Sequence, residues 1–64
     1  MKNNLKRLRE SKGLSQEKLG DNLGVSRQTI NSIENGKFDP SLPLAIKLTK
    51  FFDESIDSIF ELEN

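Results

Sequence analysis

Residues 15–36, with the sequence SQEKLGDNLGVSRQTINSIENG, decide the fold. Two short helical patterns, about residues 16–23 and 27–34, are separated by a turn signal at Gly24. Ser15 and Ser26 stand just before these patterns, where a serine hydroxyl can accept a hydrogen bond from the first helical turn. We therefore expect two short capped helices joined by a tight turn.

The apolar residues of this stretch lie three or four positions apart, so within each helix they share one face. In the first helix this face holds Leu19 and Leu23, and in the second it holds Ile30 and Ile33. Val25, in the turn, completes a small apolar plug between the two helices.

Three further helices are predicted outside this stretch. One covers about residues 4–12 and ends at Gly13, which can adopt a left-handed conformation. Asn35-Gly36 ends the helix at 27–34, Ser41 opens a fourth helix, and Ser55 opens a short fifth one. Residues 61–64 are either a frayed end or a short strand. The side chains of these outer helices that we expect to face inward are Leu5, Leu8, Leu44, Ala45, Leu48, Phe51, Phe52, Ile56, Ile59 and Phe60.

The predicted fold class is therefore all-α, with five small helices in one domain, residues 1–64. A chain of 64 residues buries only about 60% of its unfolded surface, so dimerisation would help it to be stable. It has no cysteine and no histidine, which excludes disulfides and removes the usual general base and the commonest transition-metal ligand. We see no signal peptide and no apolar run long enough to span a membrane, and we expect a soluble, cytoplasmic protein.

The net charge is zero, but the charges are unevenly distributed. Residues 1–37 hold eight basic and four acidic residues, and residues 38–64 hold two basic and six acidic ones. A basic half can meet phosphates while the acidic half faces away. Ordinary solvated surface charge explains the same numbers equally well.

The helix at 27–34 carries an unusual outer face. At 100° per residue from the buried Ile30, Gln28 falls at about 160° and Ser32 at about 200°. Asn31 and Thr29 flank this ridge, and Arg27 lies at the leading end. Arg matches the two acceptors of guanine, and Gln or Asn matches the donor and acceptor of adenine. The alternative interpretation is a polar surface helix for which Ser26 is simply a cap.

The pattern from Leu14 to Gly36 resembles the helix-turn-helix of Cro/CI-type (XRE-like) regulators. Leu14-Ser15-Gln16-Glu17 opens it, Leu23-Gly24-Val25-Ser26 makes the turn, and a segment from Ile30 to Glu34-Asn35-Gly36 closes it. The resemblance covers nearly the whole chain and is closest to small stand-alone members. It implies a lambda-repressor-like domain that binds double-stranded DNA.

The resemblance also implies roles for matching positions. Gln16 would bond a phosphate and brace the recognition helix, and Arg9 with Glu34 would form a buried ion pair. Thr29 would lie near a phosphate or a thymine methyl group. The base-reading positions would be Arg27, Gln28 and either Asn31 or Ser32, and the following loop would approach the DNA backbone with Asn35 and Lys37.

Gly20 departs from this resemblance, because the family usually has Ala in the middle of the second helix. Glycine costs about 0.5–1 kcal/mol relative to alanine in a helix. We therefore expect Gly20→Ala to stabilise the fold, unless the crossing of the two helices is too tight for a methyl group.

An enzyme is the weakest alternative function, and the sequence indicates no metal, cofactor or small-molecule ligand. The nearest thing to a site is Asp53-Glu54 with Asp57, which suits a helix cap and outer face better than weak calcium binding. The serious alternative is a protein-interaction module, such as an antitoxin-like partner that retains the fold.

The mechanism we expect is repression by a homodimer on a palindromic operator, with half-sites about 34 Å apart. The larger phage repressors have a separate dimerisation domain, which we do not expect in this protein. The dimer surface is expected around Ile59, Phe60 and Leu62, and the alternative for Phe60 is a place in the core.

Overall fold

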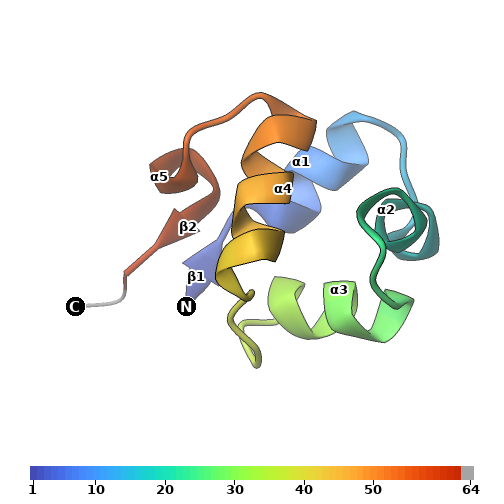
Figure 1. The fold of residues 1–64 in the computed structure, drawn as a ribbon, viewed down its shortest axis with the longest axis horizontal. Helices are drawn as coiled ribbons and strands as arrows, with labels where there is room; N and C mark the ends of the chain where they lie inside the picture. The colour runs from blue at the N-terminus through green and yellow to red at the C-terminus, as the bar shows by residue number, and fades with distance from the viewer. Residues whose placement is uncertain (63–64) are drawn as a thin grey trace.

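The computed structural model describes residues 1–62 and contains five helices and one pair of short strands within them (Figure 1). The helices are α1 (Leu5–Ser11), α2 (Gln16–Leu23), α3 (Arg27–Glu34), α4 (Leu42–Phe52) and α5 (Ile56–Ile59). The strands are β1 (Lys2–Asn3) and β2 (Phe60–Glu61). All five predicted helices are present, and the first three, for which both bounds were predicted, agree within about one residue at each end.

Serine caps begin four of the five helices. The hydroxyl groups of Ser15, Ser26, Ser41 and Ser55 each accept a hydrogen bond from the backbone N–H three residues later. Gly24 ends α2 with a left-handed φ of 77°, and Gly36 follows α3 with a φ of 74°. Pro43 is tolerated in the first turn of α4, where its missing N–H leaves no bond unmade.

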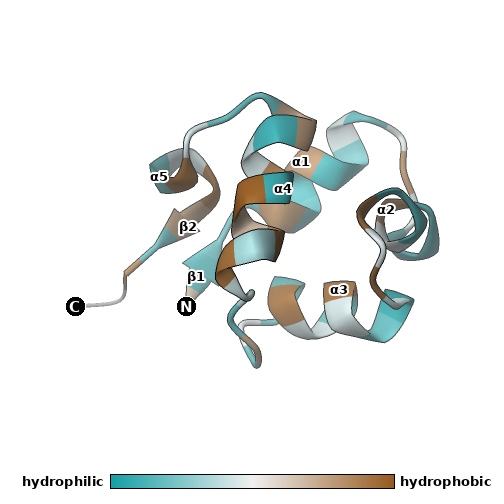
Figure 2. Cartoon of the chain, viewed as in Figure 1, coloured by the Kyte–Doolittle hydropathy of each residue, from teal (hydrophilic) through white to brown (hydrophobic). Residues whose placement is uncertain are grey.

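One hydrophobic core joins all five helices. Figure 2 shows hydrophobic colouring along much of α4, which lies in the centre of the fold. Leu5, Leu19, Ile30 and Leu48 are completely buried, from α1, α2, α3 and α4 respectively. Leu8, Val25 and Phe51, which were also predicted to face inward, are partly buried and pack against this core.

The two strands join residues near the start of the chain to residues after α5. β1 pairs with β2 in antiparallel register, Lys2 opposite Glu61 and Asn3 opposite Phe60. A short strand was one of the two alternatives predicted for residues 61–64. β1 was not predicted, because two residues are too few to show an alternating pattern. Residues 63 and 64 of that segment lie outside the described residues.

Ile56 does not face the core as predicted. It is 46% exposed, whereas Ile59, three residues later, is 1% exposed. The cause is the brevity of α5: Ile56 is its first residue, and it borders a groove against α4 instead of lying under another element.

The structure also reverses the expectation for Gly20→Ala. A Cβ atom built at Gly20 would lie 2.5 Å from the backbone oxygen of Val25. Real Cβ contacts essentially never fall below 3.0 Å, and a backbone carbonyl cannot rotate away as a side chain can. Gly20 is therefore required by the close crossing of α2 and α3.

Candidate nucleic-acid interface

The position of α3 is fixed at its N-terminal end by the turn that precedes it. The N–H of Val25 donates to the carbonyl of Gly20 at 2.9 Å, and the Ser26 hydroxyl accepts from the N–H of Thr29 at 3.1 Å. The missing side chain of Gly20 allows the turn to lie directly against α2. These local contacts set the distance between the two helices of the motif.

The outer face of α3 carries the predicted polar side chains. Ile30 and Ile33 are at most 1% exposed and turn toward the core, whereas Arg27, Gln28 and Asn31 are exposed. Thr29 and Ser32 are half-buried at the edges of this face. In Figure 1 the side of α3 opposite α4 is covered by no other helix.

Two side-chain hydrogen bonds organise this face. The hydroxyl groups of Ser26 and Thr29 lie 3.0 Å apart and share a hydrogen bond. The amide of Asn35 donates to the side-chain oxygen of Asn31 at 3.2 Å. That bond orients the Asn31 amide and leaves its two N–H groups and the second lone pair of its oxygen for another molecule.

A buried polar network holds the C-terminal end of α3. The Arg9 Nε donates to Glu34 Oε2 at 2.6 Å, and Arg9 Nη2 donates to Glu34 Oε1 at 3.2 Å. Arg9 Nη1 also donates to the carbonyl of Leu14 at 2.7 Å. The side chains of Arg9 and Glu34 are only 10% and 3% exposed, so the ion pair expected from the resemblance is present and buried.

The hydrogen bond with Glu34 is the main cause that raises the pKa of the Arg9 guanidinium above its usual value. Arg9 therefore stays charged at any pH at which the protein is studied. This buried ion pair fixes α1 against α3.

Gln16 joins the same network from α2. Its Nε2 donates to Glu34 Oε1 at 2.9 Å, so the first residue of α2 contacts the last residue of α3. Gln16 is half-buried, and the contact braces α3 as expected. Its predicted contact with phosphate remains a prediction.

Sequence reasoning missed a further anchor at Asn3. Its side-chain Nδ2 donates to the carbonyl of Ile33 at 2.8 Å, so β1 supports the end of α3. The two residues are 30 positions apart, and nothing in the local pattern of residues 1–4 indicates the contact.

The loop after α3 carries the remaining predicted DNA contacts, Asn35 and Lys37, both exposed. The N–H of Lys37 donates to the carbonyl of Ser32 at 3.0 Å, which holds the loop against the helix. Sequence reasoning also missed Phe38, which is 51% exposed and lines a groove with Gln28, Thr29 and Ser32. A single apolar residue in a loop gives no periodic signal that could have identified it.

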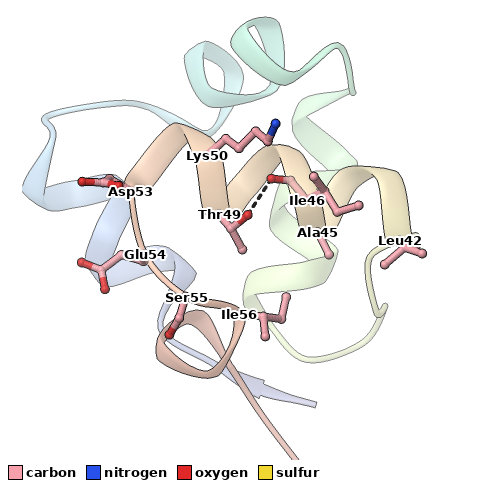
Figure 3. A pocket seen from close by; sticks show the side chains of 9 residues that line it. All are labelled: Leu42, Ala45, Ile46, Thr49, Lys50, Asp53, Glu54, Ser55 and Ile56. Carbon is pink, nitrogen blue, oxygen red and sulfur yellow. Dashed lines mark hydrogen bonds between the residues drawn. The ribbon is translucent and has the colours of Figure 1, made fainter.

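A second, apolar groove lies between α4 and α5, away from the polar face of α3. Figure 3 shows Leu42, Ala45 and Ile46 on α4 with Ile56 across from them, and Lys50, Asp53 and Glu54 toward the other end. Leu42 is 73% exposed and Ile46 is 47% exposed.

Two residues of the predicted dimer surface are buried in the core. Ile59 and Phe60 are in the core, at 1% and 7% exposed, because α5 and β2 pack them against the other helices. The prediction that they form a contact surface is therefore wrong for this conformation, and the alternative for Phe60 is correct. Leu62, at 77% exposed, remains available.

The acidic residues near α5 serve at helix ends. Asp53 adopts a left-handed φ of 54° and ends α4. Asp57 lies in the first turn of α5, where the helix dipole stabilises a negative charge. Within residues 1–62, no three His, Cys, Asp or Glu side chains are grouped so that they could hold a metal ion. No helix in the same range has the length and apolar character needed to cross a membrane.

A braced helix pair with a polar, uncovered second helix is the geometry of a helix-turn-helix. The family model described as "HTH_3: Helix-turn-helix" matches residues 5–59, and the chain belongs to this Cro/CI (XRE) family of non-enzymatic, DNA-binding transcription regulators.

Two relatives match over nearly their whole length. The chain is 56% identical over 64 residues to an uncharacterised HTH-type transcriptional regulator of Methanocaldococcus jannaschii, covering 100% of this chain and 97% of the relative. It is 51% identical over 63 residues to the uncharacterised HTH-type transcriptional regulator YgzD of Bacillus subtilis, covering 98% and 96%.

A third relative is longer. The chain is 39% identical over 59 residues to the HTH-type transcriptional activator BcrR of Enterococcus faecalis, which covers 92% of this chain but 29% of BcrR.

Proposed function

We propose that this regulator is a repressor that binds a palindromic operator as a homodimer, with one α3 helix in the major groove of each half-site. The observation that carries the proposal is the exposed, mostly uncharged, hydrogen-bonding face of α3. Arg27 suits guanine, and Gln28 and Asn31 suit adenine. A surface helix that serves only solubility would gain more from Glu–Lys pairs than from these amides and hydroxyls.

The flanking residues would fix the helix on the duplex. Gln16 is the first residue of α2 and would bond a phosphate at that helix end, where the helix dipole favours a negative charge. Asn35 and Lys37 would bond phosphates after α3, and Thr29 and Ser32 would contact the groove edge. Phosphate contacts of this kind set register without reading sequence.

The test begins by selecting bound sites from randomised duplex DNA, and then compares Gln28→Ala with Lys37→Ala. We expect Gln28→Ala to weaken binding to the selected site by about 1–3 kcal/mol and to leave binding to scrambled DNA nearly unchanged. Lys37→Ala should weaken both and reduce the magnitude of the log–log salt slope by about 0.9. Equal losses on both DNAs for Gln28→Ala would contradict base reading. No binding at low salt would favour the protein-interaction alternative.

The dimer would form through the groove between α4 and α5. Three of the five exposed large hydrophobic residues among residues 1–62, namely Leu42, Ile46 and Ile56, line this groove. Such clustering supports a contact surface here, since isolated apolar residues are the rule on monomers. Lys50, Asp53 and Glu54 also line this groove, so charges of both signs lie beside its apolar residues and could pair with those of a second copy.

Sedimentation equilibrium of Ile56→Glu tests this surface. We expect a dimer for the wild type at micromolar concentration and a monomer for Ile56→Glu, because a buried unpaired charge would face the partner. The matched control is Phe38→Ser, which removes an apolar residue of similar exposure outside the groove and should remain a dimer. A wild-type monomer at high micromolar concentration would refute the dimer. A monomeric Leu62→Ser with a dimeric Ile56→Glu would place the contact at the chain end.

Repression is the proposed outcome because occupying a promoter requires only the DNA-binding face and the dimer contact. One relative, BcrR, bears the name of an activator, so the sign must be measured. A reporter gene behind a promoter that overlaps the selected site should lose expression when the protein is produced in the cytoplasm. Increased expression would make the protein an activator.

A further inference from the structure

Phe38 lies beside the exposed polar face of α3 and has no role in the core. It is 51% exposed and lies outside the hydrophobic core cluster. Together with Ser26, Gln28, Thr29, Ser32 and Lys37 it lines one groove, so an aromatic ring lies in the same groove as Gln28, which is proposed to read a base. In Figure 1 the loop that carries it extends beyond α3 on the side facing away from α4.

The backbone holds this loop in place. The N–H of Gly36 donates to the carbonyl of Ile33 at 3.0 Å, and the N–H of Lys37 donates to Ser32 at 3.0 Å. Phe38 therefore follows directly after two anchored residues. Asp39, the acidic residue of the loop, lies 3.4 Å from the amino group of Met1, so its charge faces a positive group.

The groove offers apolar surface within a polar setting. The Thr29 hydroxyl already shares a hydrogen bond with Ser26, at 3.0 Å, and the same side chain also carries a methyl group. The ring of Phe38 is the larger apolar surface. In the major groove, the C5-methyl group of thymine is the apolar feature of a base edge, and Thr methyl groups and Phe rings suit it.

From this arrangement we infer that Phe38, with Thr29, reads a thymine methyl group in each half-site, next to the base read by Gln28. The inference rests on the proposed DNA-binding mode and adds a specificity-determining residue to it. Phe38 would not act through the DNA backbone, so its effect should depend on one methyl group.

The experiment uses the selected operator with each thymine of the half-site replaced in turn by deoxyuridine, which lacks only the methyl group. Binding is measured by fluorescence anisotropy at one salt concentration. For the wild type we expect one thymine whose replacement weakens binding by about fourfold, the value of one buried methyl group. For Phe38→Ala the same replacement should have a much smaller effect, because only Thr29 remains beside the methyl group, and Phe38→Leu should keep an intermediate effect.

The control is a thymine outside the site, where deoxyuridine should change nothing in any variant. The melting temperature of Phe38→Ala should match that of the wild type, because the ring is not in the core. Equal losses for Phe38→Ala on thymine and deoxyuridine operators would overturn the inference and place the ring on a sugar. The inference would also be overturned if the wild type and Phe38→Ala selected sites with the same preference for thymine. If the wild type binds no DNA, the proposed function itself fails.

Discussion

Gly20→Ala is the substitution that tests the packing of α2 against α3 most directly. The added Cβ would lie 2.5 Å from the Val25 oxygen, and 3.3 Å from both the carbonyl carbon and the oxygen of Ser26. All three atoms are backbone atoms of the turn that leads into α3. To reach even a 3.0 Å contact, the turn must move by at least about 0.5 Å, which disturbs the 2.9 Å bond between Val25 and Gly20.

Two opposing effects decide the result. Replacing glycine by alanine in a helix gains about 0.5–1 kcal/mol. Overpacking a well-packed contact costs about 1–3 kcal/mol, and a rigid backbone partner favours the upper part of that range. The free energy of unfolding should therefore fall by about 1 kcal/mol or more. In a domain of this size that lowers the melting temperature by about 4–8 °C per kcal/mol.

Thermal unfolding followed by circular dichroism measures this change. The matched control is Asp21→Ala, the next residue of α2, which is exposed and supplies the helix-propensity gain without the clash. We expect the control to melt at or slightly above the wild-type temperature. A melting temperature for Gly20→Ala equal to or above that of the wild type would refute the reasoning, because it would mean that the turn moves at no cost.

Two further predictions concern the supports of α3. Glu34→Gln should lower the free energy of unfolding by about 3–5 kcal/mol, since it leaves the buried Arg9 charge uncompensated; urea unfolding measures this, and the exposed Glu10→Gln should change little. Ser26→Ala and Ser41→Ala should each cost about 1 kcal/mol by removing a helix cap. Of the two, only Ser26→Ala should also weaken DNA binding in an anisotropy assay, and a loss common to both would mean that stability alone governs affinity.

The parts of the fold that the sequence predicted are those that depend on neighbouring residues. Four helices are capped by a serine that bonds an N–H three residues away, namely Ser15, Ser26, Ser41 and Ser55. Gly24 ends α2 because it can itself adopt a left-handed φ. The buried face of α3 follows from helical spacing alone. Because these features need no tertiary contact, a single sequence is sufficient to predict them.

The parts that the sequence did not predict depend on contacts between distant residues. β1 pairs with a strand almost 60 positions away, as Lys2 opposite Glu61, and its residues show no strand pattern of their own. Ile56 and Ile59 have the spacing of one helical face, yet only Ile59 is covered, because α5 has a single turn. The exposure of Phe38 beside α3 likewise depends on how the loop folds back.

Long-range hydrogen bonds also fix the position of α3. Arg9 of α1 and Gln16 of α2 bond Glu34, and Asn3 of β1 bonds the carbonyl of Ile33, so three elements converge on the last two residues of the helix. At the other end, Gly20 lets the turn lie against α2. The middle of the helix is free of such bonds and carries the exposed Gln28 and Asn31. A helix only eight residues long and held at both ends can present these side chains in one orientation, which base reading requires because hydrogen bonds to a base edge are directional.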